Sequence, residues 1–269
     1  MTMSGLLPTK TLGSSKRVLT LPYAGPRGRG PGRREGARGQ SIRLPVQGAP
    51  VRRMSNAETT EELLAQIVTA HPVGAYAERV RGMVTEGRFA HIVRVTSLAL
   101  RFAGANGLSP EQVLQVASAA ILHDAARDLS DSELLQLATP ELELERRHPL
   151  ALHGRAGRAL ASQWGVTDQA VLNAIEGHVF GVPQDDPVGM AVYVADVSEE
   201  GRGVNEQIRE LAMSDLAAAY RMAVMAKVDY LRREGKEIHP RTLATYHAIV
   251  GADPANEPGN AIGAAEGAA

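Results

Sequence analysis

Apolar residues recur at intervals of three and four along most of this chain, and this spacing limits the folds that it can adopt. Segments 88–103 and 110–122 both show it, and it places apolar side chains on one face of an α-helix. We find no alternation of apolar and polar residues of the kind that marks a half-buried strand. Aromatic residues make up only 4% of the chain, which favours helices packed through small side chains over a β-sandwich. We therefore expect an all-α protein, built as a helical bundle with an inward-facing site.

Charge divides the chain into two unlike parts. Residues 1–53 hold 11 Lys or Arg and one acidic residue, Glu35, whereas the remainder holds 18 basic and 29 acidic residues. The basic part is rich in Gly, Pro, Ser and Arg, and it has too little apolar surface to offset the entropy lost on ordering. We therefore expect a disordered basic extension over 1–54, one folded domain over 55–250, and a disordered low-complexity tail over 251–269.

Three interpretations of the basic extension stay open. As an arm, it would contact nucleic acid or an acidic partner through its charge. As an Arg-rich, acid-poor leader, it resembles an organelle transit peptide. The interpretation that we favour is that translation starts at Met54, where MSNAETTEELL begins a helix, so that residues 1–53 carry no function.

Capping residues, prolines and glycines set the expected ends of the helices. Ser55 or Asn56 can cap the first helix, which His71-Pro72 ends. Ser109 at the N-cap and a proline directly after it start the helix that leads to His123-Asp124. The expected helices cover about 55–71, 73–85, 88–103, 110–122, 131–138, 149–164, 167–178, 187–199, 205–234 and 240–250.

Composition excludes several kinds of site. The chain has no cysteine, which excludes disulfides, thiolate zinc sites and cysteine nucleophiles, so any bound metal must use imidazole and carboxylate ligands. No segment approaches the roughly 20 apolar residues of a membrane-spanning helix, and the N-terminus lacks the apolar core of a signal peptide. We therefore expect a cytoplasmic protein with no membrane partner.

The eight histidines fall into two groups. Four precede a proline or lack an acidic neighbour, and we expect them to mark helix ends or to be exposed: His71, His148, His239 and His247. The other four lie in or beside helices that have an apolar face: His91, His123, His153 and His178. Taken singly, each of these is more often a hydrogen-bonded core histidine than a ligand. A buried neutral imidazole needs partners for both ring nitrogens, however, and a metal ion with a hydrogen bond behind the ring supplies them.

Two aspartates strengthen the metal interpretation because each stands in an apolar run. Asp124 lies in AAILHDAA and Asp196 in MAVYVADV. An unpaired carboxylate is costly to bury, and a cation would stabilise it. Four imidazoles and two carboxylates suit iron, manganese or other divalent transition metals, and they exceed what one tetrahedral ion uses. The set therefore predicts two neighbouring ions with a shared carboxylate, the layout of two-metal phosphoryl hydrolysis.

Five blocks of sequence, in order along the chain, carry a family resemblance. They are Arg88-Phe-Ala-His91, LHDAARDLS at 122–130, LHG at 152–154, AIEGH at 174–178 and ADVSEEGR at 195–202. Together they resemble the signature of the HD-domain phosphohydrolases, with a finer match to the YqeK-type subgroup, the symmetrical bis(5'-nucleosyl)-tetraphosphatases. The segment 232–243, RREGKEIHPRTL, is similar to that subgroup's C-terminal helix junction. The resemblance covers about residues 60–250 and neither end of the chain.

The resemblance implies an HD-type helical fold around two divalent or mixed-valence transition-metal ions, with iron preferred over manganese or cobalt. It implies that His91, His123, Asp124 and Asp196 hold one ion, that Asp124, His153 and His178 hold the other, and that Asp124 is the bridge. The implied reaction is the symmetrical hydrolysis of diadenosine tetraphosphate to two ADP, by attack of a metal-bound hydroxide on phosphorus.

Such a substrate is strongly anionic, so we expect arginines on its phosphates. A forked guanidinium suits phosphate oxygens, and we assign Arg88 and Arg127 to them. Arg202 either joins these two or pairs with Glu199, and surface salt bridging is the alternative for Arg127 and Arg202. The expected substrate-binding set is Arg88, Arg127, Gly154, Glu199 and Arg202, and the expected catalytic residues are Asp124 and Arg127.

The chain departs from the subgroup's usual pattern without losing a proposed ligand. Arg127 stands where Lys is usual and Val179 where Thr is usual, while Ser198 and Glu200 replace an apolar residue and a proline. Two other functions therefore stay open. One is an HD phosphohydrolase of a nucleoside mono- or triphosphate, a cyclic nucleotide or guanosine tetraphosphate. The other is a non-catalytic regulator that binds a nucleotide, or nucleic acid through the basic extension. A homodimer is compatible with each of these functions.

Overall fold

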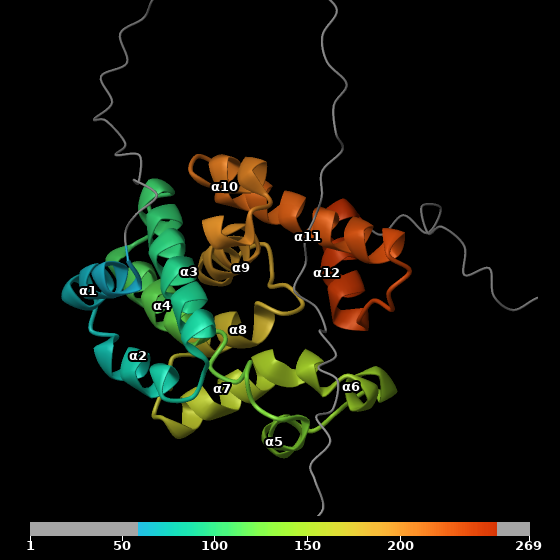
Figure 1. Cartoon of the computed structure of the whole chain (residues 1–269). Coiled ribbons are helices and arrows are strands. Elements are labelled where there is room, and N and C mark those ends of the chain that lie inside the picture. The colour runs from blue at the N-terminus through green and yellow to red at the C-terminus, as the bar shows by residue number, and fades with distance from the viewer. Residues whose placement is uncertain (1–58, 252–269) are drawn as a thin grey trace, which may run out of the picture.

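The computed structural model describes residues 59–251, and these form helices joined by short loops with no strand among them (Figure 1). The α-helices are α1 (Thr60–Ala70), α2 (Gly74–Arg81), α3 (Glu86–Ala105), α4 (Pro110–Leu122), α5 (Asp131–Leu137), α6 (Glu143–Arg147), α7 (His153–Gln163), α8 (Gln169–Gly177), α9 (Pro187–Ser198), α10 (Glu206–Ala212), α11 (Leu216–Arg233) and α12 (Pro240–Val250). Two 3-10 turns, η1 (Pro149–Leu152) and η2 (Glu200–Arg202), precede α7 and follow α9. The all-α prediction is confirmed. The two predicted tails lie outside the described residues.

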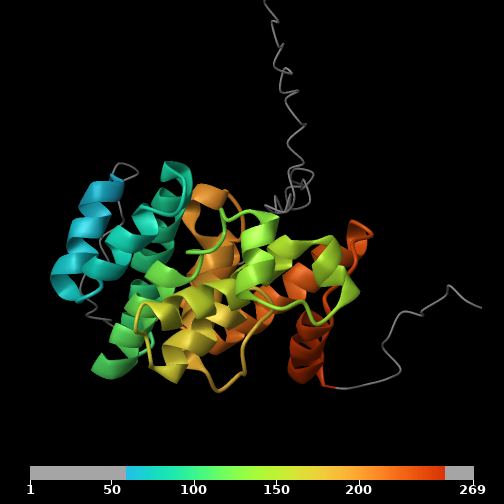
Figure 2. The ribbon, with the colours of Figure 1, turned by 90° about the horizontal axis from the view of Figure 1, so that it is seen from below.

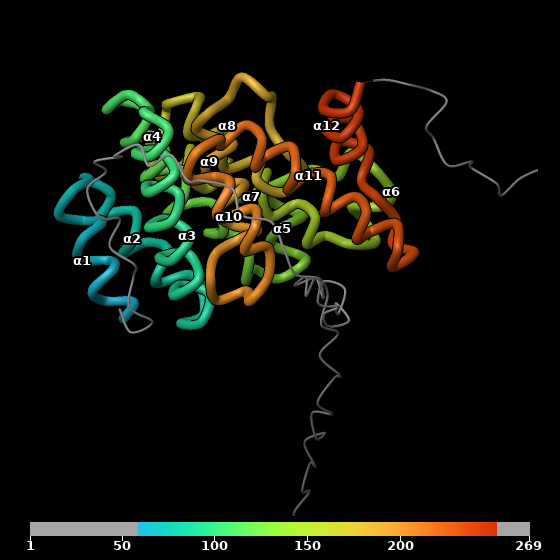
Figure 3. The backbone as a smooth tube through the Cα atoms, turned by 90° about the horizontal axis from the view of Figure 1, so that it is seen from above, coloured from blue at the N-terminus to red at the C-terminus, as the bar shows by residue number. Residues whose placement is uncertain are grey.

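Helix α9 lies at the centre of the bundle. It packs against α3, α4, α8 and α11, and its residues from Val188 to Ala195 are all buried. A helix that is apolar on every side must be enclosed in this way. Helices α1 and α2 lie at one end of the molecule and α12 at the other (Figures 2 and 3). Because Asp196 follows the buried run directly, α9 delivers this carboxylate to the interior.

The first helix begins later than predicted. Thr59 is its N-cap, because the Thr59 hydroxyl accepts from the Glu62 amide at 3.2 Å and the Thr59 amide donates to Glu62 Oε2 at 2.7 Å. This reciprocal pair is a capping box, which satisfies two otherwise unpaired amides at the helix start. The prediction that Ser55 or Asn56 caps this helix is therefore wrong. Ser109 does cap α4, with Gln112 as its capping-box partner.

The single long helix predicted over 205–234 is two helices, α10 and α11. Asp215 caps α11 by accepting from the Ala218 amide at 2.8 Å. Asn106, which follows α3, accepts from the Leu216 amide at 3.0 Å and donates to the Ala212 carbonyl at 2.8 Å. At the junction of α10 and α11, one backbone carbonyl and one backbone amide that lack a partner within a helix are thus paired by a side chain from a distant part of the chain. Likewise, the predicted helix over 149–164 divides into η1 and α7, so His153 is the first residue of α7.

Helix α6 and turn η2 were not predicted. Both are short, and neither is long enough to show a helical repeat of apolar residues. None of the helices within 59–251 has the length and apolarity needed to cross a membrane.

Candidate metal centre

The six predicted ligands come from five parts of the chain and meet inside the bundle. His91 lies in α3, His123 and Asp124 directly follow α4, His153 begins α7, His178 is the C-cap of α8, and Asp196 lies in α9. They form two triads: His91, His123 and Asp196, and Asp124, His153 and His178. Within each triad the ligand atoms lie within 4.8 Å of one another. The packing of these five helices thus gathers residues that are widely spaced in sequence.

In three of the four histidines, the same ring nitrogen, Nδ1, is hydrogen-bonded to the backbone. Each uses a backbone carbonyl three residues earlier: His123 Nδ1 lies 2.7 Å from Ala120 O, His153 Nδ1 2.6 Å from Leu150 O, and His178 Nδ1 2.6 Å from Ile175 O. A carbonyl oxygen only accepts, so Nδ1 must carry a proton, and in a neutral ring Nε2 then carries the lone pair. Burial lowers the pKa of His123 to about 4 and that of His153 to about 3. His123 and His153 are therefore neutral near pH 7, the form that binds metals.

Two features of the triads fit a bound cation, namely a short contact and a buried nitrogen without a partner. His153 Nε2 and His178 Nε2 lie 3.0 Å apart, and two lone pairs at this distance would repel unless a proton or a metal ion lay beside them. His123 Nε2 is buried and has no hydrogen-bond partner among the described residues. Ligation would satisfy this nitrogen, so the donor set fits a metal at both triads.

The Asp124 carboxylate faces both triads. Its Oδ1 lies 3.5 Å from His153 Nε2 and 3.5 Å from His178 Nε2. Its Oδ2 lies 3.8 Å from His91 Nε2 and 3.7 Å from His123 Nε2. Burial alone would raise the pKa of Asp124, but the neighbouring histidines hold it well below its ordinary value. An ionised carboxylate that presents one oxygen to each of two ligand clusters has the geometry of a bridge.

Glu199 lies behind His91, at the C-cap of α9. Its Oε1 accepts from His91 Nδ1 at 3.0 Å, and its Oε2 accepts from Arg94 Nε at 2.8 Å and from the Gly201 amide at 2.6 Å. Burial opposes ionisation, but these donors lower the pKa of Glu199 to about 2. The carboxylate therefore keeps the proton on His91 Nδ1 and turns Nε2 towards Asp196 Oδ1, 3.1 Å away. A carboxylate behind a histidine ligand orients the ring and raises its basicity.

We predict that Glu199→Gln lowers metal affinity by about 10–100-fold, because the negative charge behind His91 is lost while the size of the side chain is kept. Equilibrium dialysis of the purified protein against Mn²⁺ measures this. The matched control is Glu200→Gln, at the exposed neighbouring position, which should bind Mn²⁺ as the wild type does. Equal affinities for all three proteins would show that Glu199 does not support the site.

Three arginines lie beside the ligand carboxylates. Arg88 Nη1 donates to Asp124 Oδ2 at 2.9 Å, and Arg202 pairs with Asp196. Arg127 is partly buried and in electrostatic contact with both of these aspartates. Of the two alternatives left open for Arg202, the pairing with Glu199 is not the one found, because Arg202 pairs with the predicted ligand Asp196. Substrate binding by these three arginines stays a prediction.

Gly154 has a packing role that the sequence did not indicate. It is buried in α7, and a Cβ at this position would lie 2.6 Å from the Glu176 carbonyl oxygen and 2.7 Å from Val179 Cγ2. Only a residue without a side chain lets α7 approach α8 this closely. The predicted contact of Gly154 with substrate stays a prediction, as does substrate binding by Glu199, whose carboxylate is 2% exposed and surrounded by protein donors.

Two residues have contacts that the sequence interpretation did not predict. His239 is the N-cap of α12, so the prediction of a helix-end position is confirmed. It is buried, however, because its ring stacks on Phe180 and its Nε2 lies 3.1 Å from Glu145 Oε1. Arg94 was not singled out, although it lies one helical turn after His91, which could have marked it as a neighbour of the ligand.

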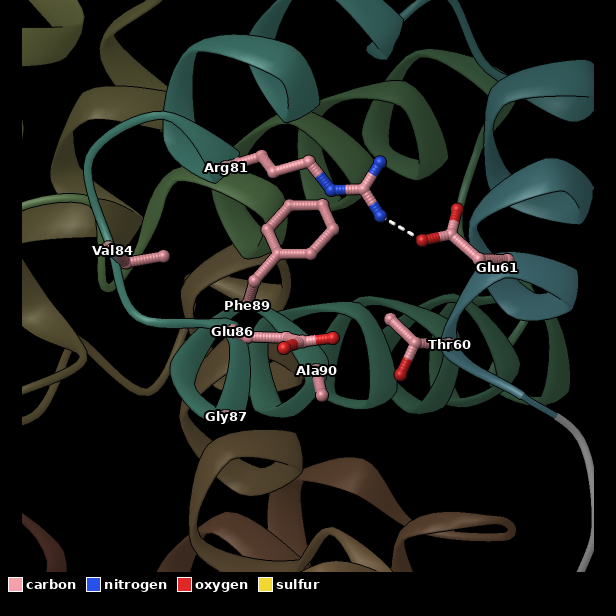
Figure 4. Close-up of a pocket in the computed structure, with 8 residues that line it drawn as sticks. All are labelled: Thr60, Glu61, Arg81, Val84, Glu86, Gly87, Phe89 and Ala90. Carbon is pink, nitrogen blue, oxygen red and sulfur yellow. Dashed lines mark hydrogen bonds and ion pairs between the residues drawn. The ribbon is translucent and has the colours of Figure 1, made fainter.

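A cavity of about 520 Å³ lies between α1, α2 and the start of α3 (Figure 4). Its lining residues are Thr60, Glu61, Arg81, Val84, Glu86, Gly87, Phe89 and Ala90. Arg81 spans it, pairing with Glu61 and lying over the Phe89 ring at 4.6 Å from the ring centroid (Figure 4). None of the six predicted ligands lines this cavity, so it is separate from the candidate metal centre.

Comparisons with known proteins identify relatives of this chain. Residues 88–201 match the HD domain family, and this range contains all six predicted ligands. The symmetrical bis(5'-nucleosyl)-tetraphosphatase of Bacillus subtilis is 30% identical over 175 residues, which is 64% of this chain and 94% of that protein. A Mycoplasma genitalium protein named probable nicotinate-nucleotide adenylyltransferase/Ap4A hydrolase is 35% identical over 152 residues, which is 52% of this chain but only 42% of that longer protein.

A solved structure shares the fold. The crystal structure of a predicted HD superfamily hydrolase involved in NAD metabolism, from Clostridium acetobutylicum, superposes with a TM-score of 0.60 and 28% sequence identity. The superposition covers 66% of this chain and 96% of that one. The chain therefore belongs to the HD-domain hydrolases, in the group that includes the symmetrical bis(5'-nucleosyl)-tetraphosphatases.

Proposed function

We propose that the chain hydrolyses dinucleoside tetraphosphates symmetrically and converts diadenosine tetraphosphate into two ADP. The observation that carries this proposal is the Asp124 carboxylate, which presents one oxygen to each of two ligand triads within a single centre. Two-ion centres of this kind suit in-line displacement at phosphorus. The name of the Bacillus subtilis relative, which aligns over 94% of its length, supports the choice of substrate.

The six ligands would hold two transition-metal ions, with iron preferred over manganese or cobalt. When bound, these ions would activate a water molecule and offset the charge of the phosphates. Water would then add its oxygen to one of the two middle phosphorus atoms. The bond from that phosphorus to the oxygen joining the two halves would break, and each half would leave as ADP.

The chain's own residues would orient the reactants. Glu199 holds the proton on His91 Nδ1 and so keeps that ring turned towards the centre. Arg88 and Arg202 already reach the ligand carboxylates Asp124 and Asp196, and their remaining N–H groups would donate to phosphate oxygens. Forked guanidinium donors are well suited to this task because they bind two oxygens at once.

The test is an assay of the purified protein, loaded with Fe²⁺, Mn²⁺ or Co²⁺, against a panel of nucleotides. Diadenosine tetraphosphate should be cleaved fastest, with ADP as the sole nucleotide product. The proposed substrate would be wrong if a nucleoside monophosphate, a nucleoside triphosphate, a cyclic nucleotide or guanosine tetraphosphate were hydrolysed faster. The protein would still be a phosphohydrolase in that case. A metal-loaded protein that cleaves none of them would favour the regulator, as would nucleic-acid binding that depends on salt and on residues 1–53.

A further inference from the structure

Lys227 brings a positive charge to the metal centre from α11, outside the range that matches the HD domain. Its Nζ donates to the carbonyl oxygen of Val179, the residue that follows the predicted ligand His178. The ammonium also lies over the ring of Tyr193, 5.5 Å from the ring centroid. Tyr193 precedes Asp196 by three residues, about one turn of α9. Lys227 therefore lies where the end of α8 meets α9, beside the part of the centre that His178 and Asp196 form.

The charge of this ammonium is poorly compensated. In the described part of the chain Lys227 forms no ion pair, and its one hydrogen bond to protein is the bond to the Val179 carbonyl. Burial lowers the pKa of Lys227 to about 8, an effect that Asp196 opposes and Arg202 reinforces. An ammonium has three N–H donors, so two are left for other acceptors. A partly buried cation with unmet donors is stabilised by an anion that binds to it.

A second unmet polar group belongs to Tyr193, whose ring lies beneath this ammonium. The Tyr193 side chain is fully buried, and its hydroxyl has no hydrogen-bond partner among the described residues. Burial raises the pKa of Tyr193 well above its ordinary value, and the charges of Tyr220 and Asp196 act in the same direction. The hydroxyl therefore stays protonated and is a neutral donor within electrostatic reach of the predicted ligand Asp196.

We propose that Lys227 binds a phosphate group of the substrate beside the metal centre, with the Tyr193 hydroxyl next to it. This inference rests on the proposed function, because a tetraphosphate chain extends beyond the phosphorus that is attacked and needs cations along its length. Arg88 and Arg202 stand at the two ligand carboxylates, and Lys227 adds a donor at the end of α8. Lys227 would thus be a substrate-binding residue that lies outside the HD signature blocks.

The test measures the binding of inorganic tripolyphosphate to the metal-loaded protein by isothermal titration calorimetry. Lys227→Met should weaken binding by about tenfold or more, because it removes charged hydrogen bonds but keeps the aliphatic stem. Lys227→Arg should retain most of the affinity. The matched control is Arg221→Met, at an exposed position of the same helix, which should bind as the wild type does. With diadenosine tetraphosphate as substrate, Lys227→Met should raise KM.

Unchanged tripolyphosphate affinity in Lys227→Met would overturn the proposal. So would a loss of bound metal in that variant, because the lysine would then support the centre and not the phosphate. If Lys227→Met fails to fold, Lys227→Gln, which can still donate to the Val179 carbonyl, makes the same comparison. Tripolyphosphate is not a nucleotide, so its binding tests Lys227 even if the wild type turns out to hydrolyse a different nucleotide.

Discussion

Replacing Asp124 with Asn is expected to slow hydrolysis by about three orders of magnitude and to remove at least one of the two proposed metal ions. The Asp124 oxygens face different triads, at 3.5 Å from His178 Nε2 and 3.7 Å from His123 Nε2. Asparagine keeps the size of the side chain but replaces one oxygen with an amide nitrogen that cannot ligate, and it also removes the charge. A loss of about 4 kcal/mol of transition-state stabilisation, reasonable for a bridging ligand, corresponds to ~10³-fold in kcat/KM.

Metal content by inductively coupled plasma mass spectrometry and steady-state rates would measure these two effects. Asp131→Asn is the matched control, because Asp131 is an exposed residue in the first turn of α5. It should keep both the metal content and the rate of the wild type. An Asp124→Asn protein that retained two ions and near wild-type rates would contradict the bridging role.

Gly154→Ala is expected to destabilise the fold and to disable the centre at the same time. The added methyl group would lie 2.6 Å from the Glu176 carbonyl oxygen, so α7 must move away from α8. His153 lies next to Gly154 and His178 follows α8, and their Nε2 atoms, now 3.0 Å apart, would separate. Overpacking of this kind costs about 2 kcal/mol. Misplaced ligands should lower kcat/KM by on the order of 10²-fold.

Chemical denaturation and Mn²⁺ binding, measured for Gly154→Ala and for a control variant, would test the Gly154 prediction. Gly104→Ala is the control, since it is exposed near the end of α3 and a Cβ there would meet nothing within 4 Å. It should leave activity unchanged and raise the free energy of unfolding by up to about 1 kcal/mol, because alanine favours helix over glycine. If Gly154→Ala behaved like this control, the close approach of α7 and α8 would not matter to the centre.

The two triads of candidate ligands could be proposed from the sequence because their surroundings in sequence already made them unusual. Asp124 and Asp196 stand in apolar runs where a carboxylate needs a cation, and the sequence blocks around them resemble those of one family. That these residues of α3, α4, α7, α8 and α9 meet at one site was implied by that resemblance and not by any local pattern. Helical spacing predicts which face of a helix is buried, but it does not predict which other helix packs against that face.

Contacts between distant residues account for what the sequence did not predict. The pair His91 and Glu199 joins positions 108 residues apart, and Asn106 reaches Leu216 across 110 residues to break the expected long helix. Glu199 was predicted to bind substrate, and nothing near it in sequence indicates that it lies behind His91. Lys227 belongs to no motif, and only the packing of α11 on α9 brings its ammonium to the ring of Tyr193.

The most direct test of the two-ion centre is anomalous X-ray diffraction from crystals of the protein loaded with Mn²⁺. We predict two anomalous peaks, one within the triad of His91, His123 and Asp196 and one within the triad of Asp124, His153 and His178, with an Asp124 oxygen bound to each ion. A single peak in this region, or two peaks that share no Asp124 contact, would contradict the proposed centre.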